Sequence, residues 1–247
     1  MVFITGDTHG DFGRFGTKIF REQKAMTRDD YVIICGDFGG LWDDSADERN
    51  HLKWLEEKPF TLLWVDGNHE NFSMLKEFPI EEWHGGKVHR IRSNIIHLMR
   101  GQIYEIEGYH FFTMGGGRSH DIQDGILDPA DPRFEFDLHW KLKRKETFRI
   151  KGISWWPEEL PARTEYDEAI ETLKRANWEV DYVITHSAPS SIVKQINENY
   201  QTDALTDFLE KISKNLKFHY WLFGHYHNNL NIGNNFVLLY EQIVQAI

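Results

Sequence analysis

The chain has 247 residues, of which 28 are basic and 39 acidic, and this balance gives a formal charge of −11. Such a charge argues against non-specific binding to nucleic acid or to an anionic membrane through the whole surface, although a local basic patch stays open. Cys35 is the single cysteine, which excludes a disulfide framework and a cysteine-based zinc site. No apolar run is long enough to span a membrane, and Met1 leads directly into a strand signal. We therefore expect a soluble, cytoplasmic protein without a membrane partner.

Short apolar runs followed by polar turns dominate the first third of the chain. The runs at 2–5, 31–35 and 61–65 predict parallel strands buried on both faces. They recur roughly every thirty residues, which is typical of β–α–β units. A helix is expected after the first strand because apolar side chains recur there at helical spacing: Phe12, Phe15, Ile19 and Phe20.

The second part of the chain predicts a change of architecture. Residues 88–114 are typical of a β-meander that begins a second sheet, and later strands and helices alternate up to residue 240. Between them, residues 115–160 show little regular pattern, and we expect an insertion that caps the functional site of a single domain spanning 1–247. The basic run at 141–145 within it is typical of a solvated face, with a nucleic-acid patch as the lesser alternative.

Polar side chains follow five of the predicted strands at the point where each strand ends. Because ligands bind beyond the carboxyl ends of strands in open α/β sheets, we expect these side chains to converge. The seven residues are Asp7, His9, Asp37, Asn68, His186, His225 and His227. A set of imidazoles, carboxylates and a carboxamide without thiolate suits Mn²⁺, Fe or Zn²⁺. The set is too large for one ion, and with one bridging carboxylate it fills two four-ligand sites, as in two-metal centres that act on phosphorus.

These motifs together resemble the calcineurin-like metallophosphoesterase superfamily. The matching segments are Gly6-Asp7-Thr8-His9, Gly36-Asp37, Gly67-Asn68-His69-Glu70, His186 and Gly224-His225-Tyr226-His227. The resemblance implies an α/β fold, a four-layer sandwich of two mixed β-sheets flanked by helices, with a dimetal site at the C-terminal strand tips. It implies that one ion is held by Asp7, His9, Asp37 and His227. The other would be held by Asp37, Asn68, His186 and His225, with Asp37 bridging and His69 facing the phosphate as the catalytic residue.

The sequence departs from the serine/threonine protein phosphatases of that superfamily. Their second motif continues to Asp-Arg-Gly and an arginine precedes their Gly-Asn-His-Glu, whereas here Phe38 to Leu41 and Asp66 occupy those places. The carboxylate partner of His69 is therefore unassigned. Arg118 and His120 follow three glycines and are the proposed substrate-binding residues, with Arg118 as a source of the missing positive charge. The alternative for both is a flexible, solvated turn.

The leading hypothesis is a dimetal-dependent phosphoesterase that hydrolyses a small phosphomonoester or phosphodiester by in-line attack of a metal-bridging hydroxide. The alternatives are a nuclease or protein phosphatase of the same superfamily, or a non-catalytic metal-binding scaffold. The charge of −11 counts against a nuclease. A scaffold would be expected to lack some ligands or His69, and this chain has all eight residues. The natural substrate, the physiological metal and the oligomeric state are left open.

Overall fold

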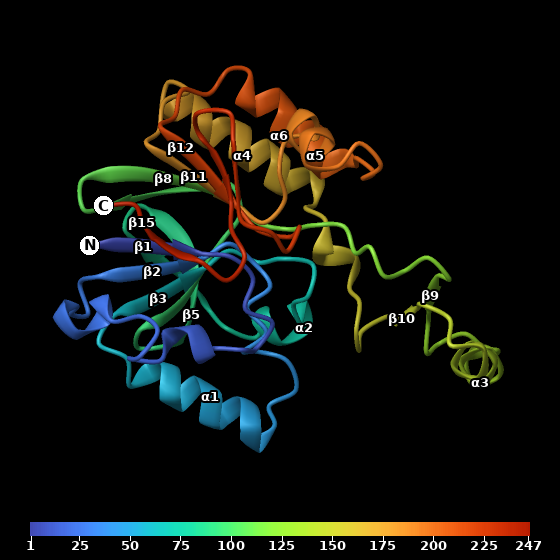
Figure 1. Ribbon diagram of the computed structural model, residues 1–247. Helices are drawn as coiled ribbons and strands as arrows, with labels where there is room; N and C mark the ends of the chain where they lie inside the picture. The colour runs from blue at the N-terminus through green and yellow to red at the C-terminus, as the bar shows by residue number, and fades with distance from the viewer.

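Two β-sheets packed face to face form the centre of the protein in the computed structural model, which describes residues 1–247 (Figure 1). Helix α1 (Ala46–Glu56) covers the outer face of one sheet. Helices α4 (Arg163–Arg175), α5 (Ser190–Ile196) and α6 (Ala204–Ser213) cover the outer face of the other. The expected α/β sandwich of two mixed sheets flanked by helices is confirmed. None of the helices combines the length and apolar character needed to cross a bilayer.

The larger sheet has seven strands and carries the first three predicted strands side by side. In spatial order the strands are β15 (Ile243–Gln245), β1 (Val2–Thr5), β2 (Tyr31–Ile34), β3 (Thr61–Trp64), β6 (Ile95–Leu98), β5 (Gly86–Arg92) and β4 (Ile80–Trp83). β1, β2, β3 and β6 run parallel, while β15 pairs antiparallel with β1 and β5 pairs antiparallel with β6. The carboxyl ends of β1, β2 and β3 therefore reach the same edge.

The smaller sheet has six strands and supplies the remaining tips. In spatial order they are β13 (Leu230–Ile232), β14 (Phe236–Leu238), β12 (Tyr220–Phe223), β11 (Tyr182–Thr185), β8 (Tyr109–Met114) and β7 (Gln102–Ile106). The expected meander is divided between the sheets, since β5 and β6 complete the first and β7 and β8 begin the second. The chain passes between them at Gly101, whose φ of 70° favours glycine.

Three apolar clusters fill the spaces between the four layers. Alternate residues of each central strand point to opposite faces, so Phe3 packs on the α1 side whereas Ile4 packs against the other sheet. Leu173 and Leu209 belong to the third cluster, under α4 and α6. Because both faces of each sheet are covered, the central strands are continuously apolar, as the sequence predicted.

The segment after the first strand does not form the expected helix, and that prediction is wrong. Two short 3-10 turns, η1 (Gly13–Phe15) and η2 (Glu22–Ala25), replace it. Glycines at 13 and 16 disfavour a helix. The three phenylalanines of the pattern are nonetheless buried in the core by the folded loop, whereas Ile19 is 69% exposed. The apolar spacing therefore reflects burial by a folded loop and not one face of a helix.

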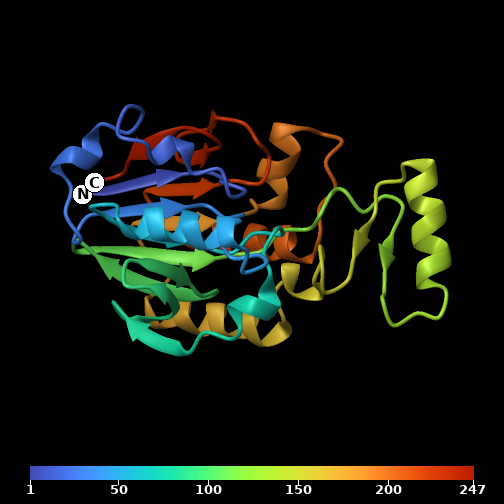
Figure 2. The ribbon, with the colours of Figure 1, turned by 90° about the horizontal axis from the view of Figure 1, so that it is seen from below.

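Residues 121–155 extend away from the sandwich and are referred to below as the arm (Figures 1 and 2). The arm contains β9 (Ile126–Leu127), α3 (Phe134–Arg144) and β10 (Arg149–Ile150), with β9 and β10 paired in parallel. No residue of α3 is buried. The arm rejoins the sandwich at Trp156, which is buried and donates a hydrogen bond of 2.8 Å to Ser73 Oγ. Capping of the site by this insertion stays a prediction, because only the base of the arm reaches the strand tips.

Two short elements complete the fold beside the strand tips. Helix α2 (Phe72–Leu75) follows the tip of β3 and begins at Asn71, whose side chain accepts a hydrogen bond from Met74 N. The turn η3 (Pro157–Glu159) follows the arm and places Glu159 against the glycine-rich loop 115–119. Both elements therefore support loops that carry candidate site residues.

Replacing a phenylalanine between the sheets should cost far more stability than replacing one on the arm. Phe111 is fully buried and stacks on Tyr182 with 4.7 Å between ring centroids, so Phe111→Ala should lower the free energy of unfolding by about 3–5 kcal/mol. Phe136 on α3 is 59% exposed, and Phe136→Ala should change it by less than about 0.5 kcal/mol. Denaturant unfolding measures both. Equal losses would contradict the solvent-exposed position of α3.

Candidate metal centre

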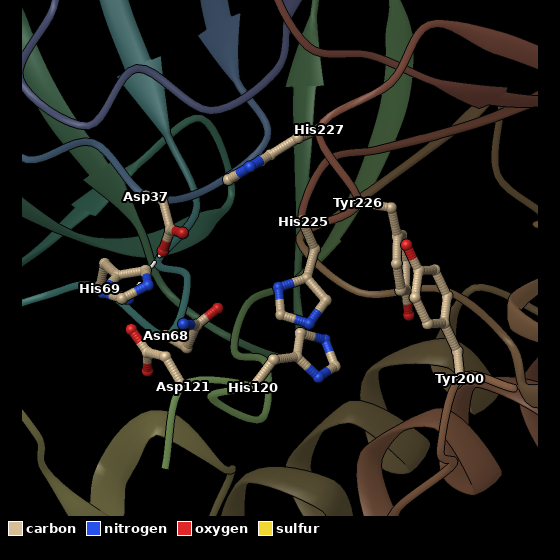
Figure 3. Close-up of a pocket in the computed structure, with 9 residues that line it drawn as sticks. All are labelled: Asp37, Asn68, His69, His120, Asp121, Tyr200, His225, Tyr226 and His227. Atoms are coloured by element: carbon tan, nitrogen blue, oxygen red, sulfur yellow. Dashed lines mark hydrogen bonds between the residues drawn. The ribbon is translucent and has the colours of Figure 1, made fainter. Parts of the chain in front are cut away.

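The tips of five strands bring the seven proposed ligands to one edge of the sandwich, at the boundary of the two sheets. They follow β1, β2, β3, β11 and β12: Asp7, His9, Asp37, Asn68, His186, His225 and His227. Four of them lie around one cavity in Figure 3, namely Asp37, Asn68, His225 and His227. The structure therefore brings together all seven side chains, as the distances below show. Their assignment as ligands stays a prediction.

The first group of potential ligand atoms lies at the tips of β1 and β12. His9 Nε2 is 3.0 Å from His227 Nε2, which in turn is 3.2 Å from Asp7 Oδ2. His9 Nε2 is also 3.7 Å from Asp37 Oδ2. One potential ligand atom from each of Asp7, His9 and His227 lies within 4.8 Å of the others. Two imidazole nitrogens and a carboxylate thus face one point, as donors around a cation do.

The second group of potential ligand atoms lies at the tips of β3, β11 and β12. His186 Nε2 is 3.1 Å from Asn68 Oδ1 and 3.1 Å from His225 Nδ1. It is also 3.5 Å from Asp37 Oδ2. The same oxygen of Asp37 therefore approaches an imidazole nitrogen of each group, which is the position that a bridging carboxylate requires.

Hydrogen bonds from the surrounding chain fix which atoms of these side chains are available to bind a metal ion. His186 Nδ1 is 2.8 Å from the carbonyl oxygen of Cys35, so Nδ1–H donates and Nε2 keeps its lone pair. Asn68 Nδ2 donates to Ser119 Oγ at 3.4 Å, which turns the amide oxygen toward His186. The available donors are thus imidazole nitrogen, carboxylate oxygen and amide oxygen, a set that fits a transition-metal ion.

Backbone strain is concentrated at the candidate ligands. His9, Asp37, His225 and His227 have φ values of 47°, 49°, 71° and 45°, in the left-handed region that residues other than glycine seldom adopt. Such conformations each cost on the order of 1–3 kcal/mol and cluster at functional sites. Gly36 is required nearby, since a Cβ atom there would lie 2.1 Å from His186 Nδ1. The surrounding fold therefore holds these side chains in a geometry that the local chain does not favour.

The charges of the centre compensate one another despite its burial. Burial opposes ionisation of Asp7, but the neighbouring His186 ring and hydrogen bonds from His227 and the His225 backbone outweigh it, so the pKa of Asp7 lies below the ordinary value. Burial lowers the pKa of His9, and it lowers that of His225 well below the ordinary value. Both imidazoles are therefore neutral near pH 7, which is the form that binds metal. A hydrogen bond to Asp7 raises the pKa of His227.

A cavity of about 400 Å³ opens over the centre (Figure 3). Its lining residues are Asp37, Asn68, His69, His120, Asp121, Tyr200, His225, Tyr226 and His227. His69 is fixed through its backbone N–H, which donates to Asp37 Oδ1 at 2.7 Å, whereas its imidazole makes no hydrogen bond. The cavity therefore joins the candidate ligands to the proposed catalytic residue.

The structure separates the two residues proposed to bind substrate. The His120 ring lies in the cavity wall, 4.6 Å from the His225 ring centroid. Arg118 is exposed, does not line the cavity, and makes no hydrogen bond or ion pair within the chain. Ser119, between them, is buried and bonded to Glu159. Substrate contacts by either residue stay predictions, and only His120 is already placed for one.

Three further residues of the cavity wall were not among those predicted from the sequence. Tyr200 and Tyr226 stack with 5.5 Å between ring centroids and form an aromatic side of the cavity. Tyr226 lies inside the Gly-His-x-His motif, where its position could have indicated it. Asp121 lies at the base of the arm, where no periodicity or motif marks it. Its place in the wall comes entirely from tertiary structure.

Asp66, at the place where protein phosphatases have an arginine, faces away from the cavity. It is buried, accepts a hydrogen bond of 2.8 Å from Arg100 Nε, and lies 3.2 Å from His97 Nε2. Burial opposes its ionisation, but the Arg100 guanidinium outweighs this and keeps the Asp66 pKa far below the ordinary value. Arg100 also donates to Glu158 O and Glu165 Oε2. This network anchors the loop that carries Asn68 and His69.

Removing the proposed bridging carboxylate should lower the occupancy of both metal sites, whereas removing a proposed ligand of one group should lower the occupancy of one site. Asp37→Asn should lower the metal content of both sites, and His9→Ala should chiefly empty a single site. His219→Ala is the control, since His219 is a surface imidazole whose side chain is 68% exposed. Elemental analysis of the purified proteins measures the metal content of each variant. Wild-type protein that binds no more than one Mn²⁺ or Fe ion after reconstitution would contradict a two-metal centre.

Breaking the buried ion pair below the β3 tip should destabilise the fold. Arg100→Leu leaves Asp66 buried without its main partner and should lower the free energy of unfolding by about 3–5 kcal/mol. Arg163→Leu is the matched control, because Arg163 is 87% exposed and its pair with Asp167 should contribute little. Chemical denaturation measures both variants. Similar stabilities would show that the Asp66 network is not a main support of the loop.

Comparison with known proteins agrees with this geometry. The model of the calcineurin-like phosphoesterase family matches residues 1–229. The lariat debranching enzyme of Homo sapiens is 21% identical over an aligned length of 256 residues, and the alignment covers 92% of this chain and 42% of the human protein. That of Danio rerio is 21% identical over 214 residues, which cover 80% of this chain and 33% of the relative. The chain thus matches 33–42% of the length of these two relatives. With nearly its whole length matched by the family model, the chain belongs to the calcineurin-like phosphoesterase family.

Proposed function

We propose that the protein is a metal-dependent phosphodiesterase that hydrolyses the ester through two ions and His69. The observation that carries this proposal is the position of Asp37, whose Oδ2 lies 3.7 Å from His9 Nε2 and 3.5 Å from His186 Nε2. One carboxylate shared by two groups of donors is the arrangement used to hold a pair of ions. A scaffold without chemistry would not need the unbonded imidazole of His69 in the same cavity.

The residues that would hold the ions are the two groups described above. The first comprises Asp7, His9, Asp37 and His227, and the second comprises Asp37, Asn68, His186 and His225. When bound, the ions supply Lewis-acid activation of the phosphoryl group and of the attacking water. The absence of sulfur donors favours Mn²⁺, Fe or Zn²⁺. The strained backbone at four of these residues supports this role, because it fixes their side chains before any ion binds.

His69 is the proposed general acid. Its backbone is bonded to Asp37, which places its ring beside the centre, and the ring centroids of His69 and His9 are 5.4 Å apart. Both ring nitrogens are free of hydrogen bonds, so one can donate a proton to the oxygen that leaves phosphorus. Proton donation of this kind typically contributes about 10²–10⁴-fold to the rate.

The walls of the cavity favour a diester with an aromatic substituent. No lysine or arginine lines the cavity, so the protein itself offers no fixed cation to neutralise the second negative charge of a phosphomonoester. The aromatic side formed by His120, Tyr200 and Tyr226 suits a planar ring such as a nucleobase. Relatives named lariat debranching enzymes are consistent with a nucleotide phosphodiester. We therefore propose a nucleotide phosphodiester of modest size as the substrate.

A substrate panel with the metal-reconstituted protein tests this function. The panel contains an aryl phosphodiester, the matching aryl monoester, a dinucleotide and a phosphopeptide, each with Mn²⁺, Fe or Zn²⁺. Metal-dependent hydrolysis with higher kcat/KM on the diesters is expected. Preference for the monoester or the phosphopeptide would contradict the diester assignment. Absence of activity on every substrate would contradict the proposal that the protein is a phosphoesterase.

The activity lost when His69 is replaced should depend on how readily the leaving group departs. Nitrophenolate leaves without a proton, whereas a ribose or serine alkoxide does not. His69→Ala should therefore keep near-normal metal content, lose activity modestly on aryl esters, and lose about 10²–10⁴-fold on alkyl esters. Steady-state kinetics on a matched pair of aryl and alkyl diesters measures this. Equal losses would indicate charge stabilisation, and loss of metal in step with activity would identify His69 as a ligand.

A further inference from the structure

The arm contributes one carboxylate, Asp121, to the wall of the cavity. Asp121 is the first residue of the arm, directly after the glycine-rich loop, and it lines the cavity together with His69. Its Oδ1 atom is buried and has no hydrogen-bond partner. A buried carboxylate oxygen without a donor is unusual, because leaving such a group unsatisfied costs on the order of 1–3 kcal/mol. The oxygen is therefore expected to meet a donor in another state of the protein.

The second oxygen of Asp121 is held within the arm. Arg149, in β10, donates to Asp121 Oδ2. Burial opposes ionisation of Asp121, but the bond to Arg149 outweighs it and brings its pKa below the ordinary value. Asp121 is thus a charged acceptor whose position is set by the arm, with one oxygen left free.

His69 lines the same cavity, and its imidazole has no hydrogen-bond acceptor. In Figure 3 the Asp121 carboxylate and the His69 ring lie on the same side of the cavity. The His69 ring makes no hydrogen bond, and the one carboxylate bonded to this residue, Asp37, accepts from the backbone N–H. A free donor and a free acceptor thus line the same side of the cavity without being joined in this structure. Hydrogen bonds among catalytic groups are often long in free enzymes and tighten when substrate binds.

We propose that Asp121 is the positioning residue for His69, accepting a hydrogen bond from one ring N–H through Oδ1 when substrate is bound. The opposite ring nitrogen is then directed toward the leaving oxygen, and the proton that it donates goes to that oxygen while Asp121 keeps its charge. This inference rests on the proposed function of His69 as general acid. The carboxylate partner of His69 then comes from the arm, whereas the motifs at the strand tips offer none.

A consequence of this assignment is that the arm takes part in the reaction. Arg149 bonds Asp121, so a shift of β10 relative to the sandwich moves the carboxylate that orients His69. A second ion pair of the arm offers a control, because Lys151 Nζ lies 2.7 Å from Asp128 Oδ2. This pair links the residues that directly follow β9 and β10, and Asp128 does not line the cavity. Replacing Asp128 therefore perturbs the arm without removing the proposed acceptor.

The kinetic test compares Asp121→Asn with Asp128→Asn on the alkyl and aryl diester pair. Asp121→Asn should lower kcat on the alkyl ester by about 10–100-fold, with KM and metal content unchanged and a much smaller effect on the aryl ester. Asp121→Glu should recover part of the loss, and Asp128→Asn should behave as wild type. Equal losses on both esters, or a similar loss in Asp128→Asn, would overturn the proposal.

A double-variant test asks whether Asp121 acts through His69. If it does, adding Asp121→Asn to His69→Ala should reduce the alkyl-ester rate no further, because the group that it positions is already gone. A further loss of tenfold or more would show that Asp121 contributes in another way, and would overturn the proposal.

A spectroscopic test separates this inference from the proposed function. Imidazole ¹⁵N shifts of His69 can be followed with a non-hydrolysable phosphodiester bound, whether or not the protein turns over any substrate. Asp121→Asn should change the balance of the two ring tautomers of His69, and Asp128→Asn should not. An unchanged tautomer balance in Asp121→Asn would overturn the positioning role even if the wild-type protein proves to be an active phosphodiesterase.

Discussion

Two buried carboxylates, those of Asp7 and Asp37, constrain the structure around them. Their side chains are 0% and 2% exposed, and such charges are tolerated only when cations or hydrogen bonds compensate them. Imidazoles and backbone N–H groups supply that compensation from both sheets, and closely packed glycines make room for them. The strained conformations at the strand tips are a further result, because ordinary backbone angles would not aim these side chains at one place.

The sequence predicted the strand tips well because their signal is local. An apolar run followed by glycine and a residue type that can bind metal indicates both the strand and its end, as at Ile34 and Asp37, which lines the cavity. The helix expected after the first strand was wrong because Phe12, Phe15 and Phe20 are buried by a folded loop and not by one face of a helix. Periodicity alone does not distinguish these two ways of burying the same residues.

Other parts of the site depend on contacts between residues distant in the chain, which no motif records. In the sequence, Asp66 stands where protein phosphatases have an arginine. In the structure it is a buried acceptor, because Arg100, in the turn after β6, donates a hydrogen bond to it. Asp121 lies in a stretch without periodicity, and its place in the cavity wall follows from how the arm leaves the sandwich. Arg118 is a different case: three glycines before an arginine suggested a phosphate contact, its side chain is exposed, and the contact stays a prediction.

The centre lies across the boundary between the two sheets, with Asp7, Asp37 and Asn68 on one side and His186 and His225 on the other. An ion held by both sides would therefore be a further cross-link between the two layers, in addition to the apolar core and the hydrogen bonds that already join them. Binding only to the folded state stabilises it by RT ln(1 + [L]/Kd), or about 2.7 kcal/mol when free metal is 100 times Kd. With the proposed ions bound, the cohesion of this edge of the sandwich would follow the free metal concentration, and a chelator would loosen the architecture.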